Sequence, residues 1–215
     1  MGDLLSSTST NHEAGAAELI RMSRAKPLVV LARSFVFVRH GETDGNRQRV
    51  YQVAEQPLNA NGLAQARRAA DSLRTHPAKR IYASTMPRAW RTAEIIAAPH
   101  GLPLIPSDHV RERWFGSLVG SAITTIDWAY DPPGGETLVE FVKRTRRGFV
   151  EALTEEHGSL VVAHGGNLRV LSNGLGLELP QEMGANASPL LFERAGASWN
   201  VTPIGSINPL IGVAS

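Results

Sequence analysis

The sequence predicts an α/β protein in which a mostly parallel central sheet lies between two layers of helices, a three-layer α/β/α fold. Three observations predict this fold. Short apolar runs, typical of buried strands, alternate along the chain with longer segments of helical periodicity. Glycine and proline mark the boundaries between these segments. Apolar residues make up 42% of the chain, which is enough for the core that a layered fold must bury.

The first half of the chain contains three strand patterns and two helix patterns. Ser34 to Val38 is an apolar run with β-branched and aromatic residues, which predicts a buried strand. Pro87 suits the first turn of a helix, because a backbone N–H at that position would have no partner within the helix. In order, we expect a strand at 34–38, a helix that follows 57–61 and runs to Thr75, a strand at 80–84, a helix at 87–96 and a strand at 102–105.

The second half begins with residues 111–135, which show no regular pattern. Residues 136–156 have helical periodicity, and His157-Gly158 closes that helix. Residues 160–163 form another apolar run, and Gly165-Gly166 opens the next helix. Near the C-terminus, residues 190–193 and 198–202 are expected to pair as a hairpin.

Residues 1–33 are expected to form a flexible N-terminal tail, and residues 34–215 to form the domain. Leu5 to Ala17 is rich in small and hydroxyl-bearing residues, which favour disorder. The apolar run at 27–32 is far shorter than the roughly 20 residues of a membrane span. Acidic residues precede that run, which argues against a signal peptide. We therefore expect a cytoplasmic protein that does not bind a membrane.

Charge and cysteine content exclude several classes of function. The 22 basic and 20 acidic residues leave a formal net charge of only +2, so the composition does not favour nucleic acid as a partner. Lys143 to Arg147 is a basic run inside a helical pattern, and we interpret it as a solvated helix face. The chain contains no cysteine, which excludes disulfides, a thiolate nucleophile and zinc–thiolate sites.

Two histidines follow two of the apolar runs directly. His40 comes after the run at 34–38, within Arg39-His40-Gly41-Glu42-Thr43, and His164 comes after the run at 160–163. Ligands of open α/β sheets bind beyond the carboxyl ends of strands, so both histidines are expected at one site. A neutral imidazole is a competent nucleophile toward phosphorus. We expect the second ring nitrogen of His40 to donate to a backbone carbonyl, which would fix the tautomer.

Arg39 and Arg88 are the expected phosphate ligands, because a guanidinium donates in a planar fork that matches two phosphate oxygens. A different interpretation of Arg88 is a surface residue in the first turn of a helix. However, a cation there opposes the helix dipole, whereas a bound anion would satisfy both the arginine and the free N–H groups.

His164-Gly165-Gly166 is expected to place backbone N–H groups at a helix start, with His164 as a protonated donor beside the phosphoryl group. The alternative is a histidine that only caps the helix. Glu112 is the expected proton donor, since aromatic neighbours would raise its pKa. The alternative interpretation of Glu112 is a surface carboxylate that forms a salt bridge with an adjacent arginine. Glu42 and Glu136 are the other candidates for the proton donor.

Taken together, these residues resemble the histidine phosphatase superfamily, in its phosphoglycerate mutase-like branch. The resemblance rests on blocks in order along roughly residues 35–205: Arg39 to Thr43 with Asn46; Leu58, Gly62, Gln65 and Ala66; Ser84, Arg88, Ala89, Thr92 and Ala93; Glu112, Phe115-Gly116 and Gly120; Gly134 to Thr137; and Val162 to Gly166. The resemblance implies a nucleophile at His40, a proton donor at Glu112, and no metal or other cofactor. It also implies phosphate contacts from Arg39, Asn46, Arg88 and His164, and we add Thr43 and Gly165 to the expected binding residues.

The chain departs from the family pattern in two places. Gln52-Val53 stands where members often have Gln-Gly, which affects a loop and not the chemistry. Phosphoglycerate mutases of the family carry a long basic insertion after the acid, whereas Ser117 to Pro133 contains no lysine or arginine. A mutase must retain a doubly charged intermediate, so this absence favours hydrolysis of a small phosphorylated substrate.

Two other functions stay open from the sequence: a phosphoglycerate mutase, and a relative that binds phosphate without useful turnover. The oligomeric state also stays open, and a homodimer is one option.

Overall fold

The computed structural model describes residues 16–124 and 126–205, and it places six strands in one mixed sheet. Four strands are parallel and lie in the order β3-β2-β4-β1, while β5 and β6 continue the sheet in antiparallel orientation. The strands are β1 Ser34–Arg39, β2 Arg80–Ser84, β3 Leu104–Ser107, β4 Ser159–Ala163, β5 Pro189–Ala195 and β6 Ser198–Pro203. The expected α/β class, with a mostly parallel sheet, is therefore confirmed.

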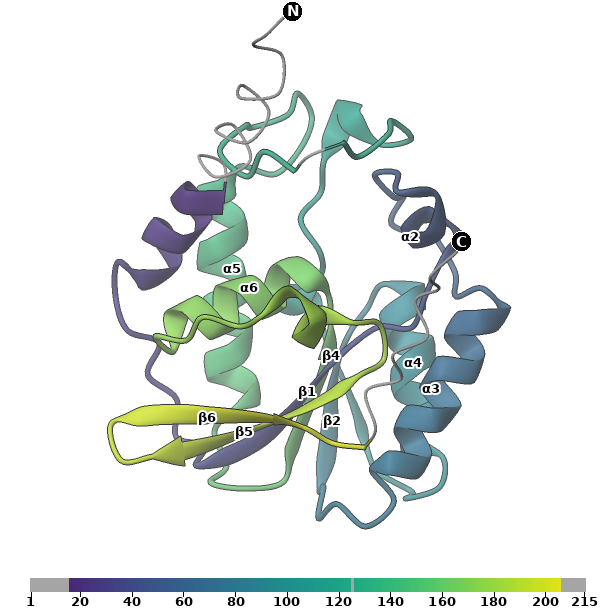
Figure 1. Cartoon of the computed structure of the whole chain (residues 1–215), viewed down its shortest axis with the longest axis vertical. Coiled ribbons are helices and arrows are strands. Elements are labelled where there is room, and N and C mark those ends of the chain that lie inside the picture. The colour runs from purple at the N-terminus through teal and green to yellow at the C-terminus, as the bar shows by residue number, and fades with distance from the viewer. Residues whose placement is uncertain (1–15, 125, 206–215) are drawn as a thin grey trace, which may run out of the picture.

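Helices cover both faces of this sheet (Figure 1). Helices α3 Ala60–Ser72 and α4 Pro87–Ala97 cover one face, and α5 Leu138–Ala152 and α6 Gly165–Gly174 cover the other. The short helix α2 Asp44–Gln48 follows β1 beyond the end of the sheet, and 3-10 turns lie at Asp108–Val110, Gly116–Leu118 and Gln181–Gly184. Each expected helix and strand is present, and its ends lie within a few residues of the expected ones. Helix α5 starts at Leu138, not at Glu136, because the side chains of Thr137 and Glu140 cap it reciprocally. Helix α2 was not expected, because it has only five residues.

Alternate residues of the central strands face opposite helical layers. Phe35 and Phe37 of β1 pack into a core with residues of α5 and α6, including Phe149. Val36 and Val38 pack into a second core with residues of α3 and α4. Because successive side chains of a strand point to opposite faces, a continuous apolar run is what a sheet buried on both sides requires.

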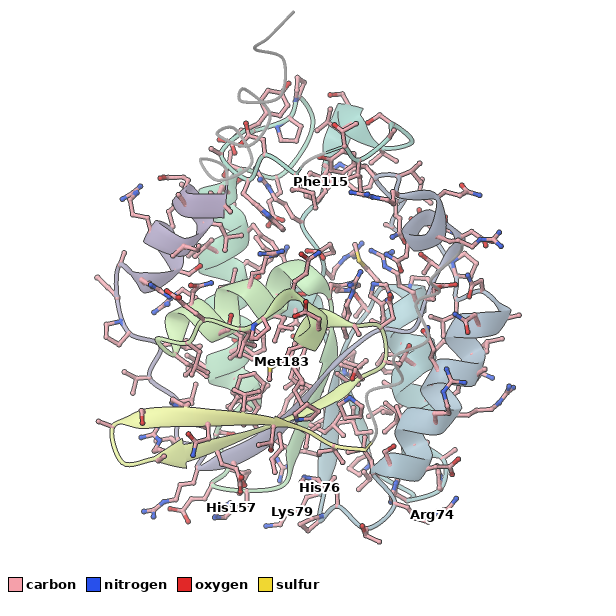
Figure 2. The ribbon with its side chains drawn as sticks, in the orientation of Figure 1. Arg74, His76, Lys79, Phe115, His157 and Met183 are labelled. Atoms are coloured by element: carbon pink, nitrogen blue, oxygen red, sulfur yellow. The ribbon has the colours of Figure 1, made fainter. Side chains whose placement is uncertain are left out.

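The register of β1 and β4 determines where the two histidines lie. Arg39 pairs with Ala163 at the end of the parallel ladder. The next residue, His40, still donates its backbone N–H to the Ala163 carbonyl at 2.9 Å. His40 and His164 therefore leave the sheet side by side at its carboxyl edge. Phe115 lies at this end of the molecule, whereas His76 and His157 lie at the opposite end (Figure 2).

Residues 16–33 differ from the tail expected at 1–33. Residues 1–15 lie outside the described part, but residues 16–24 are helical and residues 25–33 run along the domain. Leu19 is 1% exposed and packs in a third core with Trp128 and Phe141. Leu28 and Val30 belong to the core beneath α5 and α6. The expectation is corrected for this segment: its few apolar residues are spaced to reach the domain, although its composition is typical of a tail.

No helix in the described part of the chain is long and apolar enough to cross a membrane.

We expect Leu19→Ala to lower the free energy of unfolding by about 2–4 kcal/mol, because it leaves a cavity in the third core. Val29→Ala is the matched control, since Val29 is 75% exposed, and it should change stability by no more than about 0.5 kcal/mol. Denaturant unfolding of both variants measures the difference. Equal effects would show that residues 16–24 do not pack on the domain in solution.

Candidate active site

His40 is buried at the carboxyl edge of the sheet, with 3% of its surface exposed. Its Nδ1 lies 2.7 Å from the Gly41 carbonyl oxygen. A carbonyl can only accept a hydrogen bond, so Nδ1 carries the proton and Nε2 keeps its lone pair. Burial lowers the pKa of His40 well below 6.5, and the charges of Arg88 and Arg39 lower it further. The ring is thus held in the neutral form that a nucleophile needs.

Gly41 allows the chain to turn away from β1 in a crowded place. A Cβ atom on Gly41 would lie 2.5 Å from the backbone oxygen of Gly62, the third residue of α3. The backbone N–H of Gly41 donates to the Thr92 hydroxyl at 3.0 Å. The residue after His40 is therefore fixed between α3 and α4, and only glycine fits there.

Arg39 and Arg88 bring two positive charges to the same buried region. Nη1 of Arg39 donates to the Gly184 carbonyl at 2.9 Å, and Nη1 of Arg88 donates to the carbonyls of Val53 and Ala54, each at 3.3 Å. In the described part of the chain, Nε of each arginine is buried without a hydrogen-bond partner, and neither arginine forms an ion pair. Burial lowers the pKa of Arg88 to about 10. Such groups are suited to an anion that supplies the missing contacts.

His164 stands beside His40, with 5.0 Å between the ring centroids and an angle of 60° between the ring planes. It precedes α6, and its Nε2 lies 2.8 Å from the Ser84 hydroxyl oxygen. We expected a protonated ring, but burial and the positive charge of Arg88 lower the pKa of His164 well below 6.5. The expectation concerned the ring beside a bound phosphoryl group, and for that state it stays a prediction.

Glu112 reaches the site from the segment between β3 and α5. Its carboxylate accepts the backbone N–H groups of Arg113 and Gly166, each at 3.0 Å. A side chain at position 166 would collide with the Glu112 carboxylate, so the glycine there allows this approach. Glu112 is half-buried, and its charge acts on both Arg39 and Arg88. It is therefore not the solvated surface carboxylate of the alternative interpretation.

The two competing carboxylates have other partners. Glu42 accepts a hydrogen bond from the Asn59 side chain at 2.8 Å. Glu136 forms a two-bond ion pair with Arg144, with both distances at 2.7 Å. Of the three candidates, Glu112 is the one bonded to the start of α6, directly beyond His164.

Thr43, Asn46 and Gly165 lie at the starts of two helices. The Thr43 hydroxyl accepts the Asn46 backbone N–H at 3.0 Å and so caps α2. The Asn46 side-chain oxygen accepts from Thr43 and from Asn186. Gly165 is the first residue of α6 and lies against the Arg39 guanidinium. Thr43 and Asn46 therefore cap α2 together, and Asn46 is also linked to His40 through Asn186.

Several residues that shape the site were not expected from the sequence. Asn186 donates to the His40 carbonyl at 2.8 Å, from a stretch without a strand or helix pattern. Arg113 has a fully buried side chain that fixes the loop after Glu112. A family block contained Ser84, which offered a signal, but the pairing of Ser84 with His164 joins residues 80 positions apart.

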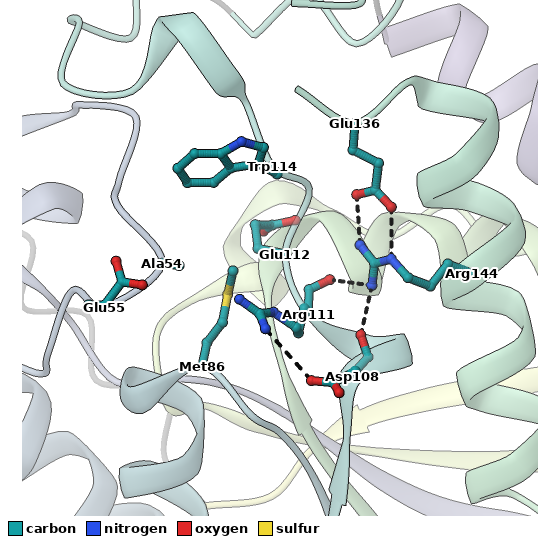
Figure 3. A pocket seen from close by; sticks show the side chains of 9 residues that line it. All are labelled: Ala54, Glu55, Met86, Asp108, Arg111, Glu112, Trp114, Glu136 and Arg144. Atoms are coloured by element: carbon teal, nitrogen blue, oxygen red, sulfur yellow. Dashed lines mark hydrogen bonds and ion pairs between the residues drawn. The ribbon is translucent and has the colours of Figure 1, made fainter. Parts of the chain in front are cut away.

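A pocket of about 470 Å3 opens next to Glu112 (Figure 3). Trp114 and Met86 provide its apolar surface, and Arg144 reaches across toward Glu136. Its lining consists of Ala54, Glu55, Met86, Asp108, Arg111, Glu112, Trp114, Glu136 and Arg144. A second hollow of about 740 Å3 shares Trp114, Glu136 and Arg144 with this pocket. The described residues contain no cluster of three side chains able to hold a metal ion.

Comparisons with known proteins agree on one family. A model of the histidine phosphatase superfamily (branch 1) matches residues 35–204. The uncharacterized phosphatase PhoE of Bacillus subtilis is 34% identical over 173 residues, which cover 76% of this chain and 90% of that protein. The probable phosphoglycerate mutase GpmB of Proteus mirabilis is 32% identical over 158 residues, which cover 65% of this chain and 74% of that protein.

Two further comparisons concern a longer protein and a solved structure. Agropine synthesis reductase of Rhizobium rhizogenes is 33% identical over 178 residues, or 78% of this chain, but the match spans only 41% of that protein. The solved structure of a mycobacterial glucosyl-3-phosphoglycerate phosphatase with VO3 has a TM-score of 0.65 and 27% identity. That match covers 79% of this chain and 97% of the mycobacterial chain.

We expect the imidazoles of His40 and His164 to stay neutral below pH 6.5 in the folded protein, because burial and Arg88 disfavour their charged forms. The unfolded chain takes up protons near pH 6.5, so the free energy of unfolding should decrease as the pH falls through that value. NMR titration in phosphate-free buffer, with signals assigned through His40→Asn and His164→Asn, measures both midpoints. Midpoints at or above 6.5 would contradict the buried cationic environment.

Proposed function

The chain belongs to the histidine phosphatase superfamily, and on that premise we propose that it is a phosphomonoester hydrolase that works without a metal ion, through a phosphohistidine on His40. One observation carries this proposal. Two buried arginines without carboxylate partners flank a neutral histidine whose Nδ1 is tied to a backbone carbonyl. An anion that enters this region meets positive charge and a ready nucleophile at once.

Substrate binding uses the charges that the protein leaves uncompensated. The phosphoryl oxygens take the free donors of Arg39 and Arg88, together with the side chain of Asn46 and the backbone at Gly165. An added anion also reverses the electrostatic penalty on His164, so the ring can take a proton and donate to the phosphoryl group. The leaving group then lies in the pocket beside Glu112, which is lined partly by Trp114 and Met86.

The first chemical step transfers the phosphoryl group to His40. The Nε2 lone pair attacks phosphorus, and the bond from phosphorus to the leaving oxygen breaks with its electron pair on oxygen. Glu112 enters this step in its protonated form and gives the proton to that oxygen, so an alcohol leaves. The ring gains positive character, which the Nδ1–H bond to the Gly41 carbonyl stabilises.

The second step restores the enzyme. Glu112, now a carboxylate, takes a proton from water while the water oxygen attacks phosphorus. The bond from phosphorus to Nε2 breaks, and its electron pair returns to the imidazole. Inorganic phosphate leaves, and Glu112 is protonated for the next cycle. Each group thus ends the cycle in the state in which it began.

A phosphoglycerate mutase is the second candidate, because GpmB is among the similar proteins. The composition of the pocket favours hydrolysis. Segment 117–133 contributes no basic residue, and the buried side chain of Arg113 donates to backbone oxygens and to Asp131. The pocket lining also carries carboxylates from Glu55 and Asp108. The two arginines of the lining, Arg111 and Arg144, pair with Asp108 and Glu136, so acidic side chains outnumber basic ones there. A bisphosphate needs cations at this place, and this balance disfavours a second anionic group.

A third reading, a regulatory protein that binds phosphate without turnover, is disfavoured because the nucleophile, both arginines and a carboxylate lie together. It predicts phosphate binding without any covalent intermediate, so the trapping experiment below separates it from hydrolysis.

We expect His40→Asn to lower kcat/KM for p-nitrophenyl phosphate by at least about a thousand-fold, because the covalent step is lost. His157→Asn is the matched control, since that histidine lies at the opposite end of the sheet, and it should retain activity (Figure 2). Acid quench during turnover of labelled substrate should trap label on the wild-type protein and not on His40→Asn. Full activity of His40→Asn, or no trapped label in an active enzyme, would refute the phosphohistidine mechanism.

A coupled assay with 3-phosphoglycerate separates hydrolysis from mutase activity. We expect release of inorganic phosphate from p-nitrophenyl phosphate and no formation of 2-phosphoglycerate, with or without added bisphosphate, because the pocket cannot retain a doubly charged intermediate. Formation of 2-phosphoglycerate faster than release of phosphate would establish the mutase instead.

A further inference from the structure

All three nitrogens of the Arg144 guanidinium are engaged at the edge of the pocket (Figure 3). Nε and Nη2 each donate to a carboxylate oxygen of Glu136 at 2.7 Å. Nη1 points the other way and donates to three backbone carbonyls, those of Asp108, His109 and Arg111, at 3.1, 2.9 and 3.0 Å. One cation thus joins α5 to the backbone just before Glu112.

The backbone just after Glu112 is tied to the same place. Nε of Arg113 donates to the Glu136 carbonyl at 2.9 Å, and the Glu136 backbone N–H donates to the Trp114 carbonyl at 2.8 Å. Glu136 therefore holds the chain on one side of Glu112 through Arg144, and on the other side through Arg113 and Trp114.

The contacts of Arg144 and Glu136 take the place of the helix or strand hydrogen bonds that residues 111–115 lack. Residues 111–115 belong to no helix or strand, so no regular backbone hydrogen bonds hold the segment that carries Glu112. The Glu112 carboxylate is bonded to the N–H groups of Arg113 and Gly166, and its position therefore depends on where the backbone around it is held. The side chains of Arg144 and Glu136 are only 23% and 17% exposed, so their ion pair is screened less than a surface pair. A proton donor must be held within roughly 0.5 Å of its working position, which is the accuracy that such a rigid support provides.

We propose that Arg144 and Glu136 are positioning residues for the general acid, and that they act by fixing the backbone on both sides of Glu112. This inference rests on the proposed function, because it takes Glu112 as the proton donor. Neither residue gives or receives the proton. The pair should therefore affect only the step in which a proton reaches the leaving oxygen.

The leaving group makes this role measurable. An alkoxide is a poor leaving group, so an alkyl phosphate depends on the acid. A p-nitrophenolate is a stable anion and leaves without a proton. The ratio kcat/KM covers the reaction only up to departure of the leaving group, so it excludes the later hydrolysis of phosphohistidine, which both substrates share. A misplaced acid must lower kcat/KM for the alkyl phosphate selectively.

The experiment measures kcat/KM of the full chain for glycerol 2-phosphate and p-nitrophenyl phosphate. We expect Arg144→Lys and Glu136→Gln each to lower the value for glycerol 2-phosphate by about 10- to 100-fold and the value for p-nitrophenyl phosphate by less than about threefold. Arg74→Lys is the matched control, because Arg74 also pairs with a carboxylate, that of Asp71, and lies at the end of the molecule opposite to Phe115 (Figure 2). It should change neither value. Glu136→Gln keeps the shape of the side chain, so the test survives if Arg144→Lys does not fold.

Glu112→Gln separates failure of this inference from failure of the proposed function. It should show the same selective loss, and adding Arg144→Lys to it should cause no further selective loss, because the acid is already absent. Suppose that Glu112→Gln lowers kcat/KM mainly for glycerol 2-phosphate and the Arg144 and Glu136 variants do not. The positioning role is then overturned, and Glu112 remains the proton donor. If Glu112→Gln lowers both substrates equally, Glu112 is not the donor, and the inference falls with it.

Discussion

Two buried guanidinium groups without carboxylate partners impose the main constraint on this structure. A buried charge is costly unless other groups compensate it, and backbone carbonyls around Arg39 and Arg88 do so only in part. Burial lowers the pKa of His40 and of His164, and the charges of the two arginines lower it further, so the site holds two neutral rings beside two cations. The sheet edge is thus unfavourable until an anion occupies it. In the proposed mechanism, the two arginines both bind the phosphoryl group and help to keep His40 neutral.

The sheet makes this concentration of charge tolerable. Strands β1 and β4 are adjacent and parallel, so the histidines that follow them leave the sheet together. Two packed cores, one on each face, hold these strands from both sides. Rigid elements therefore carry His40, His164 and Arg88, whereas the carboxylate of Glu112 comes from a loop. That division explains why Glu112 needs support from Arg113 and Arg144 and the histidines do not.

Local patterns predicted the parts of the molecule that short-range physics determines. Continuous apolar runs predicted the strands, and the residue after each run predicted where His40 and His164 would lie. Long-range contacts were beyond such patterns. Asn186 reaches the His40 carbonyl from a segment without periodicity, and Leu19 is buried although its segment has the composition of a tail. The burial of the His164 ring, which lowers its pKa, was also beyond such patterns, because desolvation depends on the assembled site and not on neighbours in sequence.

Trp114, Glu136 and Arg144 form a wall between the two hollows. The residues on its two sides differ in how readily they can be replaced. The phosphate half is built from strand ends and helix starts, where most changes would disturb the sheet. The other hollow is lined partly by exposed side chains of α5, such as Lys143 and Arg147, which can be replaced without touching the nucleophile. Trp114, Glu136 and Arg144 belong to both hollows. Under the proposed function, changes in the outer hollow can alter the preferred leaving group alone, whereas changes to Glu136 or Arg144 also disturb the backbone around Glu112.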